Sequence, residues 1–261
     1  MIKFEKPVYK ITEYQKTSNF GKFELEPLER GFGTTLGNAL RRVMLSSLPG
    51  SSIVCVKIDG VMHEFQKIDG IREDVTTIIL NLKKLVVKNH TEEVKTLTLS
   101  SDKPGVVTAD MFEKNADVEI VNPELEICTL TKGGKINMEI TIANGRGYVE
   151  AKVNKELYGN GKVGIIPVDS NFSPIEIVKY EAVDTRVGQN ENYDKLVLEV
   201  TTDGSMLPEE AIALANGILK KNGKTPRDFN CQGCMLQSTC TQEKCTLELG
   251  EIKIEKKFIC F

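Results

Sequence analysis

One stretch decides the fold of this chain, residues 26–50, EPLERGFGTTLGNALRRVMLSSLPG. It joins a glycine-rich turn to a segment in which apolar residues recur with the period of one helix face. We therefore expect a helix over residues 34–47, capped at its start by Thr34 or Thr35 and ended by Pro49-Gly50. The apolar face of this helix consists of Leu36, Ala39, Leu40, Val43 and Met44.

The other side of the same helix carries residues of a different kind. Arg41 and Arg42 lie beside Asn38 and Leu45, away from the apolar face. A guanidinium presents a rigid fork of donors that matches a carboxylate or backbone carbonyls, and the leucine adds apolar area. We therefore predict that this face of the helix binds another protein.

The stretch resembles the signature of the bacterial DNA-directed RNA polymerase alpha subunits. Similar segments follow in the same order over roughly residues 1–222, and an ordered set of that length is far more specific than one short pattern. They are residues 54–65, residues 73–83, Gly145-Arg-Gly-Tyr148, Ser173-Pro174, Thr185-Arg-Val-Gly188, Tyr193-Asp-Lys-Leu196, Asp203-Gly-Ser205 and Pro208-Glu-Glu-Ala211.

The composition is ordinary for a globular protein. The chain has 261 residues, of which 40% are hydrophobic and 27% charged, enough for one or two domains with cores. No apolar run reaches the ~18 residues of a membrane span, and no signal segment opens the chain, so we expect a cytoplasmic protein without a membrane partner. A net charge of −3 argues against a protein that wraps nucleic acid, and we expect little direct DNA contact.

The apolar pattern indicates one domain interrupted by another. Strand-like alternation occurs before the first helix, at Phe23 and Leu25, and returns over residues 195–200 ahead of a second helix. The residues between them are β-rich, with a short helical pattern and a strictly alternating Val54, Val56 and Ile58. Turn signals stand at Lys103-Pro-Gly105, Lys132-Gly-Gly134 and Asn144-Gly145.

These patterns predict an α+β fold in three parts. A discontinuous two-layer domain, which the resemblance implies to be a dimerisation domain, takes residues 1–50 and 170–223, and an inserted β-rich domain takes residues 51–169. A cysteine-rich tail takes residues 224–261. The resemblance implies the same discontinuous arrangement.

The second helix, over residues 208–221, begins with Pro208, Glu209 and Glu210, which suit the first turn and its positive dipole. Its apolar face and that of the first helix are by themselves most simply interpreted as the core of a monomer. The resemblance implies instead that both helices pack against their copies in a homodimer. The predicted dimer interface consists of Phe32, Leu36, Leu40, Val43, Ile212, Ala215, Ile218 and Leu219.

Glycines before a helix are also the pattern of a phosphate cradle, which would make the chain a nucleotide-binding enzyme. A P-loop needs lysine and then a hydroxyl residue directly after its last glycine, whereas Gly37 is followed by Asn38. The two histidines, His63 in a predicted strand and His90, offer little material for a catalytic site, and no clustered aspartates could hold two magnesium ions. We expect no catalytic residue and no required cofactor on this chain.

Six of the seven cysteines form two groups, and Cys260 stands beyond them near the end of the chain. Cys55 and Cys128 stand singly in apolar segments and are interpreted as buried small residues. The spacing of four thiols in the tail is typical of a zinc site, or less often an iron–sulfur cluster, against the alternative of a disordered or adventitious tail. Alternating residues around Gly250-Glu251 predict a small hairpin beside them. The four tail thiols are Cys231, Cys234, Cys240 and Cys245.

The tail stands where the resembled family continues into a small helical domain that contacts DNA. Nothing after Gly223 is similar to that domain. A natural short alpha subunit, a paralogue with a metal module and a rearranged or frame-shifted gene end all remain open.

The resemblance implies a homodimeric scaffold that nucleates assembly of the beta and beta-prime subunits of RNA polymerase, with omega and sigma in the same assembly. It assigns the beta contact to Asn38, Arg42 and Leu45, and the beta-prime contact to Lys83 and Val168. The alternative is an alpha-like dimeric metal-binding regulatory protein that no longer assembles with polymerase. Retention of Arg42 together with Lys83 favours the scaffold.

Overall fold

The computed structural model describes residues 7–15, 19–159, 164–188, 190–221, 248–249 and 252–253. The chain divides into two compact units, each described here by itself. Unit 1 consists of the residues up to Leu48 and from Ile175 onward, and unit 2 is the continuous segment Pro49–Pro174. The chain therefore leaves unit 1 after the first helix and returns at Ile175, somewhat outside the boundaries of 50 and 170 expected from the sequence. The mixture of helices and antiparallel sheets confirms the α+β class.

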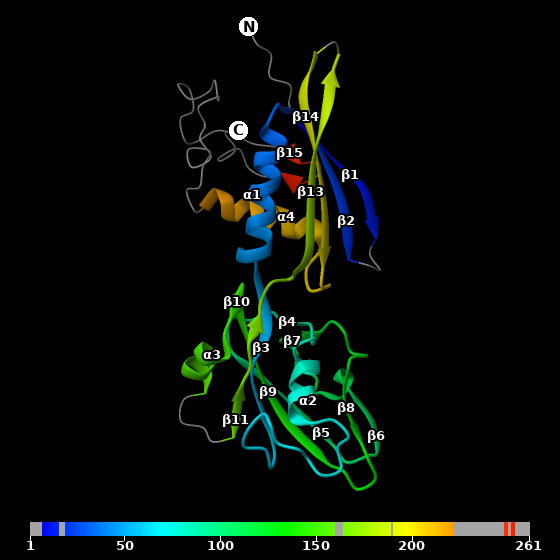
Figure 1. Cartoon of the computed structure of the whole chain (residues 1–261), viewed down its shortest axis with the longest axis vertical. Coiled ribbons are helices and arrows are strands. Elements are labelled where there is room, and N and C mark those ends of the chain that lie inside the picture. The colour runs from blue at the N-terminus through cyan, green and yellow to red at the C-terminus, as the bar shows by residue number, and fades with distance from the viewer. Residues whose placement is uncertain are drawn as a thin grey trace. The chain divides into compact units, whose positions relative to one another are not determined.

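Unit 1 is a four-stranded antiparallel sheet with two helices on one face. The strand order is β1 (Val8–Gln15), β2 (Phe20–Glu29), β14 (Asn190–Thr202) and β13 (Ile175–Val187). Figure 1 shows α1 (Phe32–Ser47) and α4 (Pro208–Lys221) on the same side of this sheet, and the two helices contact each other. The core between these two layers includes Phe23, Leu40, Met44, Leu196, Leu198, Val200, Ala211, Ile212 and Ala215.

The opposite face of this sheet is charged. Strand residues alternate between faces, so Lys22 and Glu24 point away from the core that Phe23 enters. Cross-strand ion pairs form on this side, with Lys22 Nζ 2.9 Å from a Glu199 oxygen and Lys195 Nζ 3.3 Å from a Glu24 oxygen. This alternation of apolar and charged residues explains why the helices cover only one face.

Unit 2 is built around the sheet β11-β3-β9-β5. Its central strands β3 (Pro49–Ile58) and β9 (Ile136–Arg146) are flanked by β11 (Ile165–Pro167) and β5 (Lys95–Ser101). Helix α2 (Val75–Leu82) adds Ile78, Ile79 and Leu82 to the core. The smaller elements are β4 (Val87–Asn89) paired with β7 (Val118–Ile120), β6 (Gly105–Thr108) paired with β8 (Glu126–Leu130), β10 (Tyr148–Val149) paired with β12 (Ser170–Asn171), the 3-10 turn Ala109–Met111 and α3 (Ala151–Tyr158).

Strand β3 is buried on both faces in its middle. Val56 belongs to the main core of unit 2, whereas Val54 and Cys55 join a second cluster with Ala143 and Phe172. The second cluster explains an error of the sequence prediction, which expected a turn at Asn144-Gly145. Both residues lie within β9, because a side chain at Gly145 would come within 2.8 Å of the Phe172 ring and only glycine lets the strand pass.

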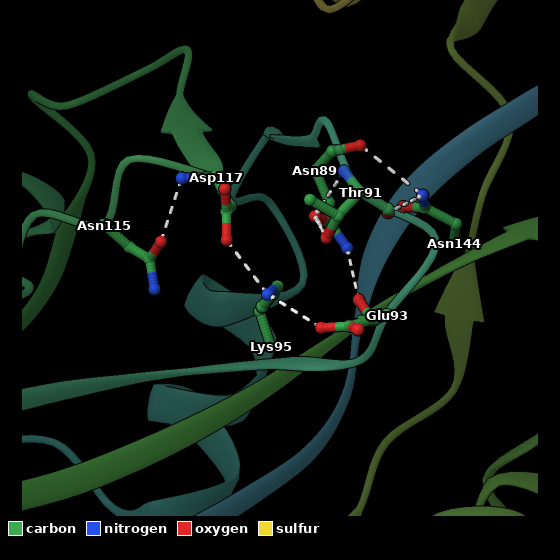
Figure 2. A network of polar contacts seen from close by, with 7 residues as sticks. All are labelled: Asn89, Thr91, Glu93, Lys95, Asn115, Asp117 and Asn144. Carbon is green, nitrogen blue, oxygen red and sulfur yellow. Dashed lines mark hydrogen bonds and ion pairs between the residues drawn. The ribbon is translucent and has the colours of Figure 1, made fainter.

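A network of polar contacts fastens the segment between β4 and β5 to strand β9. Asn89 is 7% exposed, its side-chain nitrogen donates to the Glu93 carbonyl at 2.8 Å, and its side-chain oxygen accepts from the Thr91 N–H at 3.1 Å. Asn144 donates to the Thr91 carbonyl at 2.7 Å. The buried amide is thus satisfied within the protein, as such groups must be. Figure 2 shows this network with Asn89, Thr91, Glu93, Lys95, Asn115, Asp117 and Asn144.

Two sequence predictions concern the end of the chain, a small hairpin and a group of four thiols. The short strands β15 (Glu248–Leu249) and β16 (Ile252–Lys253) pair antiparallel, which confirms the predicted hairpin. The four tail thiols that precede it lie outside the described residues. In the part of the chain that is described, no helix is both long and apolar enough to cross a bilayer.

Candidate functional site

The glycine-rich turn is organised by a carboxylate from a distant strand. Asp194 on β14 is 6% exposed, and its Oδ2 accepts hydrogen bonds from the N–H of Gly31 at 2.8 Å and of Gly33 at 3.2 Å. A carboxylate at this place neutralises the positive end of the α1 dipole and satisfies amides that the helix leaves free. The position that a phosphate would occupy is therefore filled by the protein's own anion, which argues against the nucleotide-binding interpretation.

The predicted threonine cap of this helix is wrong. Helix α1 begins at Phe32, two residues earlier than expected, and its N-cap is Gly31 in the left-handed region with φ of 89°. Thr35 lies inside the helix, where its hydroxyl donates to the Gly31 carbonyl at 3.1 Å. Glycine adopts a positive φ without steric cost, and Asp194 supplies the acceptor that a capping threonine would have given.

Two other glycines let α1 lie close to the sheet. A side chain at Gly37 would come within 2.5 Å of the Tyr180 ring, and one at Gly33 within 3.0 Å of the Ala182 methyl group. Both contacts are with β13, so the glycines fix the distance between the helix and this strand. The spacing of the glycines serves packing within unit 1.

The polar face of α1 is exposed as the sequence analysis expected. Four residues of this face, Asn38, Arg41, Arg42 and Leu45, are exposed. On the other side of the helix, the side chains of Leu40 and Met44 are only 4% and 0% exposed. Among the described residues, neither Arg41 nor Arg42 forms an ion pair. The guanidinium of Arg42 is therefore available to an acceptor outside this unit, on a helix whose opposite face is fixed in the core.

The predicted dimer residues fall into two groups. Leu40, Ile212 and Ala215 are buried in the single chain, at 4%, 6% and 0% exposure, because they form the core between the helices and the sheet. The remaining residues are half-buried at the edge of that core, and Leu214 next to them is 37% exposed. Leu214 was recognised in the apolar face of the helix but was not included in the predicted interface. The half-buried group is Phe32, Leu36, Val43, Ile218 and Leu219.

In unit 2 the structure brings Lys83 and Val168 together around one recess. The recess has a volume of about 90 Å³ and is called the Lys83 recess below. Lys83 follows directly after α2, and its Nζ lies 3.0 Å from an oxygen of Asp169. The side chain of Val168 is 3% exposed and belongs to the core, so this residue offers little more than the inner surface of the recess. The lining residues are Ser52, Ile53, Lys83, Tyr148, Val168, Asp169 and Asn171.

Asp169 is the organising residue of this recess. Its Oδ1 accepts a hydrogen bond from the N–H of Ala151, the first residue of α3, at 2.8 Å. This bond and the one from Lys83 stabilise the carboxylate and hold the pKa of Asp169 below its ordinary value. Desolvation and the charge of Asp169 raise the pKa of Tyr148. Sequence reasoning missed Asp169, although Tyr148 stands in one of the motifs that carry the resemblance.

Catalytic and metal-binding chemistry has little support in the described part of the chain. Across the described ranges, no group of three or more His, Cys, Asp or Glu side chains is placed to hold a metal ion. His63 lies in an exposed loop and not in the predicted strand, and His90 lies 3.6 Å from a Glu119 oxygen. Cys55 and Cys128 are buried as predicted, and burial raises the pKa of the Cys128 thiol to about 12, so that thiol stays protonated.

Comparison with known proteins agrees with the inserted unit 2. The sequence profile of the RNA polymerase Rpb3/RpoA insert domain matches residues 56–173, which lie within unit 2. A DNA-directed RNA polymerase subunit alpha from Alkaliphilus metalliredigens (strain QYMF) is 52% identical over 222 residues, which cover 85% of this chain and 70% of that protein. The chain belongs to the RNA polymerase alpha subunit family. As a member, it is the alpha subunit of DNA-directed RNA polymerase, the nucleotidyltransferase complex of transcription, and is a non-catalytic subunit of that complex.

Proposed function

We propose that this alpha-family chain is a homodimeric scaffold on which the beta and beta-prime subunits of RNA polymerase assemble, in a complex that also holds omega and sigma. The observation that carries the proposal is the exposed row Asn38, Arg42 and Leu45 on α1. Its helix is fixed to the sheet by its glycines and by Asp194, so the row is held rigid before any partner arrives. A preorganised surface loses little conformational entropy on binding.

The dimer forms through the half-buried apolar residues of α1 and α4. Leu36 and Val43 lie on α1, and Ile218 and Leu219 lie on α4, all at the edge of the unit 1 core. A second copy that covers them would complete their burial, at about 25 cal/mol for each Å² of apolar surface removed from water. The fully buried Leu40, Ile212 and Ala215 support this face from within and contribute little direct contact.

The beta subunit binds the exposed row of α1, and Arg42 supplies its strongest contact. A planar guanidinium at the centre of an interface forms paired hydrogen bonds that lysine and alanine cannot reproduce. The beta-prime subunit binds unit 2 around Lys83 and Val168. Support for the second assignment comes from the recess that these two residues share.

The test is capture of each large subunit by tagged variants. Arg42→Ala should keep the dimer and weaken capture of beta by more than about tenfold, as expected for an arginine hot spot. Arg146→Ala is the matched control, because Arg146 is an exposed arginine in unit 2. If Arg42→Ala captures beta as the parent does, the assignment of this helix face is wrong.

The metal-binding alternative has no support in the described residues. A zinc site at Cys231, Cys234, Cys240 and Cys245 remains a proposal for the tail, separate from the scaffold function. Its ligands do not overlap with the residues proposed to hold the dimer or the large subunits.

A further inference from the structure

The Lys83 recess carries no free charge for a partner. Lys83 would be the obvious contact for a partner's carboxylate, yet its ammonium already lies 3.0 Å from Asp169. The second oxygen of Asp169 is bonded to the Ala151 N–H, so the carboxylate is held from two sides. Lys83 and Asp169 together form a neutral wall, and a charged partner group would have to compete with this pair.

The inner surface of the recess is apolar. Ile53 and Val168 are 3% exposed and belong to the core of unit 2, so their surfaces that face the recess are backed by packed side chains. A volume of about 90 Å³ is several times what one water molecule needs and less than the ~150 Å³ of an apolar cavity that accepts benzene. The recess therefore suits one branched or linear aliphatic side chain better than an aromatic ring.

An exposed aromatic residue stands at the edge of the recess. Tyr148 is 66% exposed and lines the same recess as Lys83. Strand β10, which carries it, pairs with β12 in the register Tyr148 to Asn171, so the tyrosine is placed by backbone hydrogen bonds. Tyrosine is enriched among the residues that dominate binding energy at interfaces, because it buries a large rigid area and keeps a polar tip.

We propose that the Lys83 recess receives one aliphatic side chain of the beta-prime subunit, and that Tyr148 covers this side chain as the anchor of the contact. The inference rests on the proposed function, which places beta-prime at Lys83 and Val168. It adds the chemistry of the contact. In this contact Lys83, paired with Asp169, lines the recess and does not bind a carboxylate of the partner. A neutral recess with an apolar interior favours an uncharged side chain over a partner carboxylate.

The decisive variant fills the recess and leaves both residues of the ion pair in the sequence. Ser52 lines the recess from β3 and is half-buried, so Ser52→Leu places a larger apolar side chain where the partner's would go. We expect this variant to weaken beta-prime capture by at least about tenfold, since burial of one aliphatic side chain is lost. Ser52→Ala is the matched control, because it keeps the recess open, and it should capture beta-prime as the parent does. Capture of beta and dimer size should be the same in both variants.

A second pair of variants covers the case in which Ser52→Leu unfolds, which thermal melting would show. Tyr148→Ala should weaken beta-prime capture by about tenfold, whereas Tyr148→Phe keeps the ring and should retain most of it. If Ser52→Leu is folded and captures beta-prime normally while Lys83→Ala does not, the recess proposal is overturned and the beta-prime site stands. Normal capture by Ser52→Leu, Tyr148→Ala and Lys83→Ala together would overturn both. Loss of beta instead of beta-prime would show that the partner is misassigned.

Discussion

Asp194 is expected to be the residue on which the start of helix α1 depends most. Asp194→Ala removes the acceptor of two backbone N–H groups, those of Gly31 at 2.8 Å and Gly33 at 3.2 Å. A hydrogen bond to a charged group contributes about 1.5–3 kcal/mol, and a carboxylate near a helix N-terminus contributes up to about 2 kcal/mol in part of the same interaction. Gly31 is exposed and water can replace its partner, whereas Gly33 is buried. The expected loss is therefore about 3 kcal/mol of the free energy of unfolding of unit 1.

Two further variants separate this effect from a general loss of charge. Asp194→Asn can keep an oxygen at the position of Oδ2 and should lose only about 1 kcal/mol, because both bonds run to that one atom. Asp184 lies opposite Asp194 in the β13–β14 register and is exposed, so Asp184→Ala is the matched control and should change stability by less than about 0.5 kcal/mol.

The assay combines denaturant unfolding with hydrogen–deuterium exchange of the α1 peptide. Each unit has its own apolar core, so denaturant unfolding can combine two transitions, whereas the exchange of amides in α1 reports the local effect directly. A loss of about 3 kcal/mol corresponds to roughly a hundredfold faster exchange through local opening. If Asp194→Ala exchanges as slowly as the parent, the carboxylate does not hold the helix start and the reasoning fails.

Three other predictions concern the dimer interface, the partly buried carboxyl group of Asp203 and the cysteine-rich tail. Leu36 is half-buried and Leu40 is 4% exposed, so Leu36→Asp should give folded monomers in sedimentation while Leu40→Asp should unfold unit 1, and a folded dimer of Leu36→Asp would contradict the interface. Burial raises the pKa of Asp203 above its ordinary value of 3.8, so protonation of this carboxyl stabilises the folded state below that pH, and this stabilisation is lost as the pH rises through the folded-state pKa. Asp203→Asn should therefore be more stable than the parent at neutral pH. Denaturation curves should show the difference in stability shrinking towards about pH 4. An equal difference at both pH values would exclude the linkage. If the four tail thiols bind zinc, elemental analysis should find about one ion per chain, and chelation should leave the dimer intact; purified protein without zinc or iron under metal-replete, reducing conditions would exclude the site.

Helices α1, α2 and α4 could be predicted from residue patterns, although α1 begins earlier than expected and α3 was not predicted. Helix α4 begins and ends at residues 208 and 221 as expected, and α2 occupies the predicted helical pattern of Val75 to Leu82. Such patterns succeed because helix periodicity is set by side chains three and four positions apart. The predictions failed where a residue distant in sequence decides the local conformation. Gly145 was interpreted from its neighbours in sequence, but its strand conformation follows from the Phe172 ring packed against it.

The amino-acid sequence by itself determined helices α1, α2 and α4, the burial of Cys55 and Cys128, the exposed Arg42 face and, through its resemblance, the family. Only the tertiary structure decided how the predicted site residues are used. It placed Asp194 against Gly33, 161 residues away in sequence, and it paired Lys83 with Asp169. It also divided the residues of the predicted dimer interface into a buried group and a half-buried group. Periodicity is a property of near neighbours, whereas caps, charge pairing and burial depend on which distant segments pack together, and no local pattern contains that information.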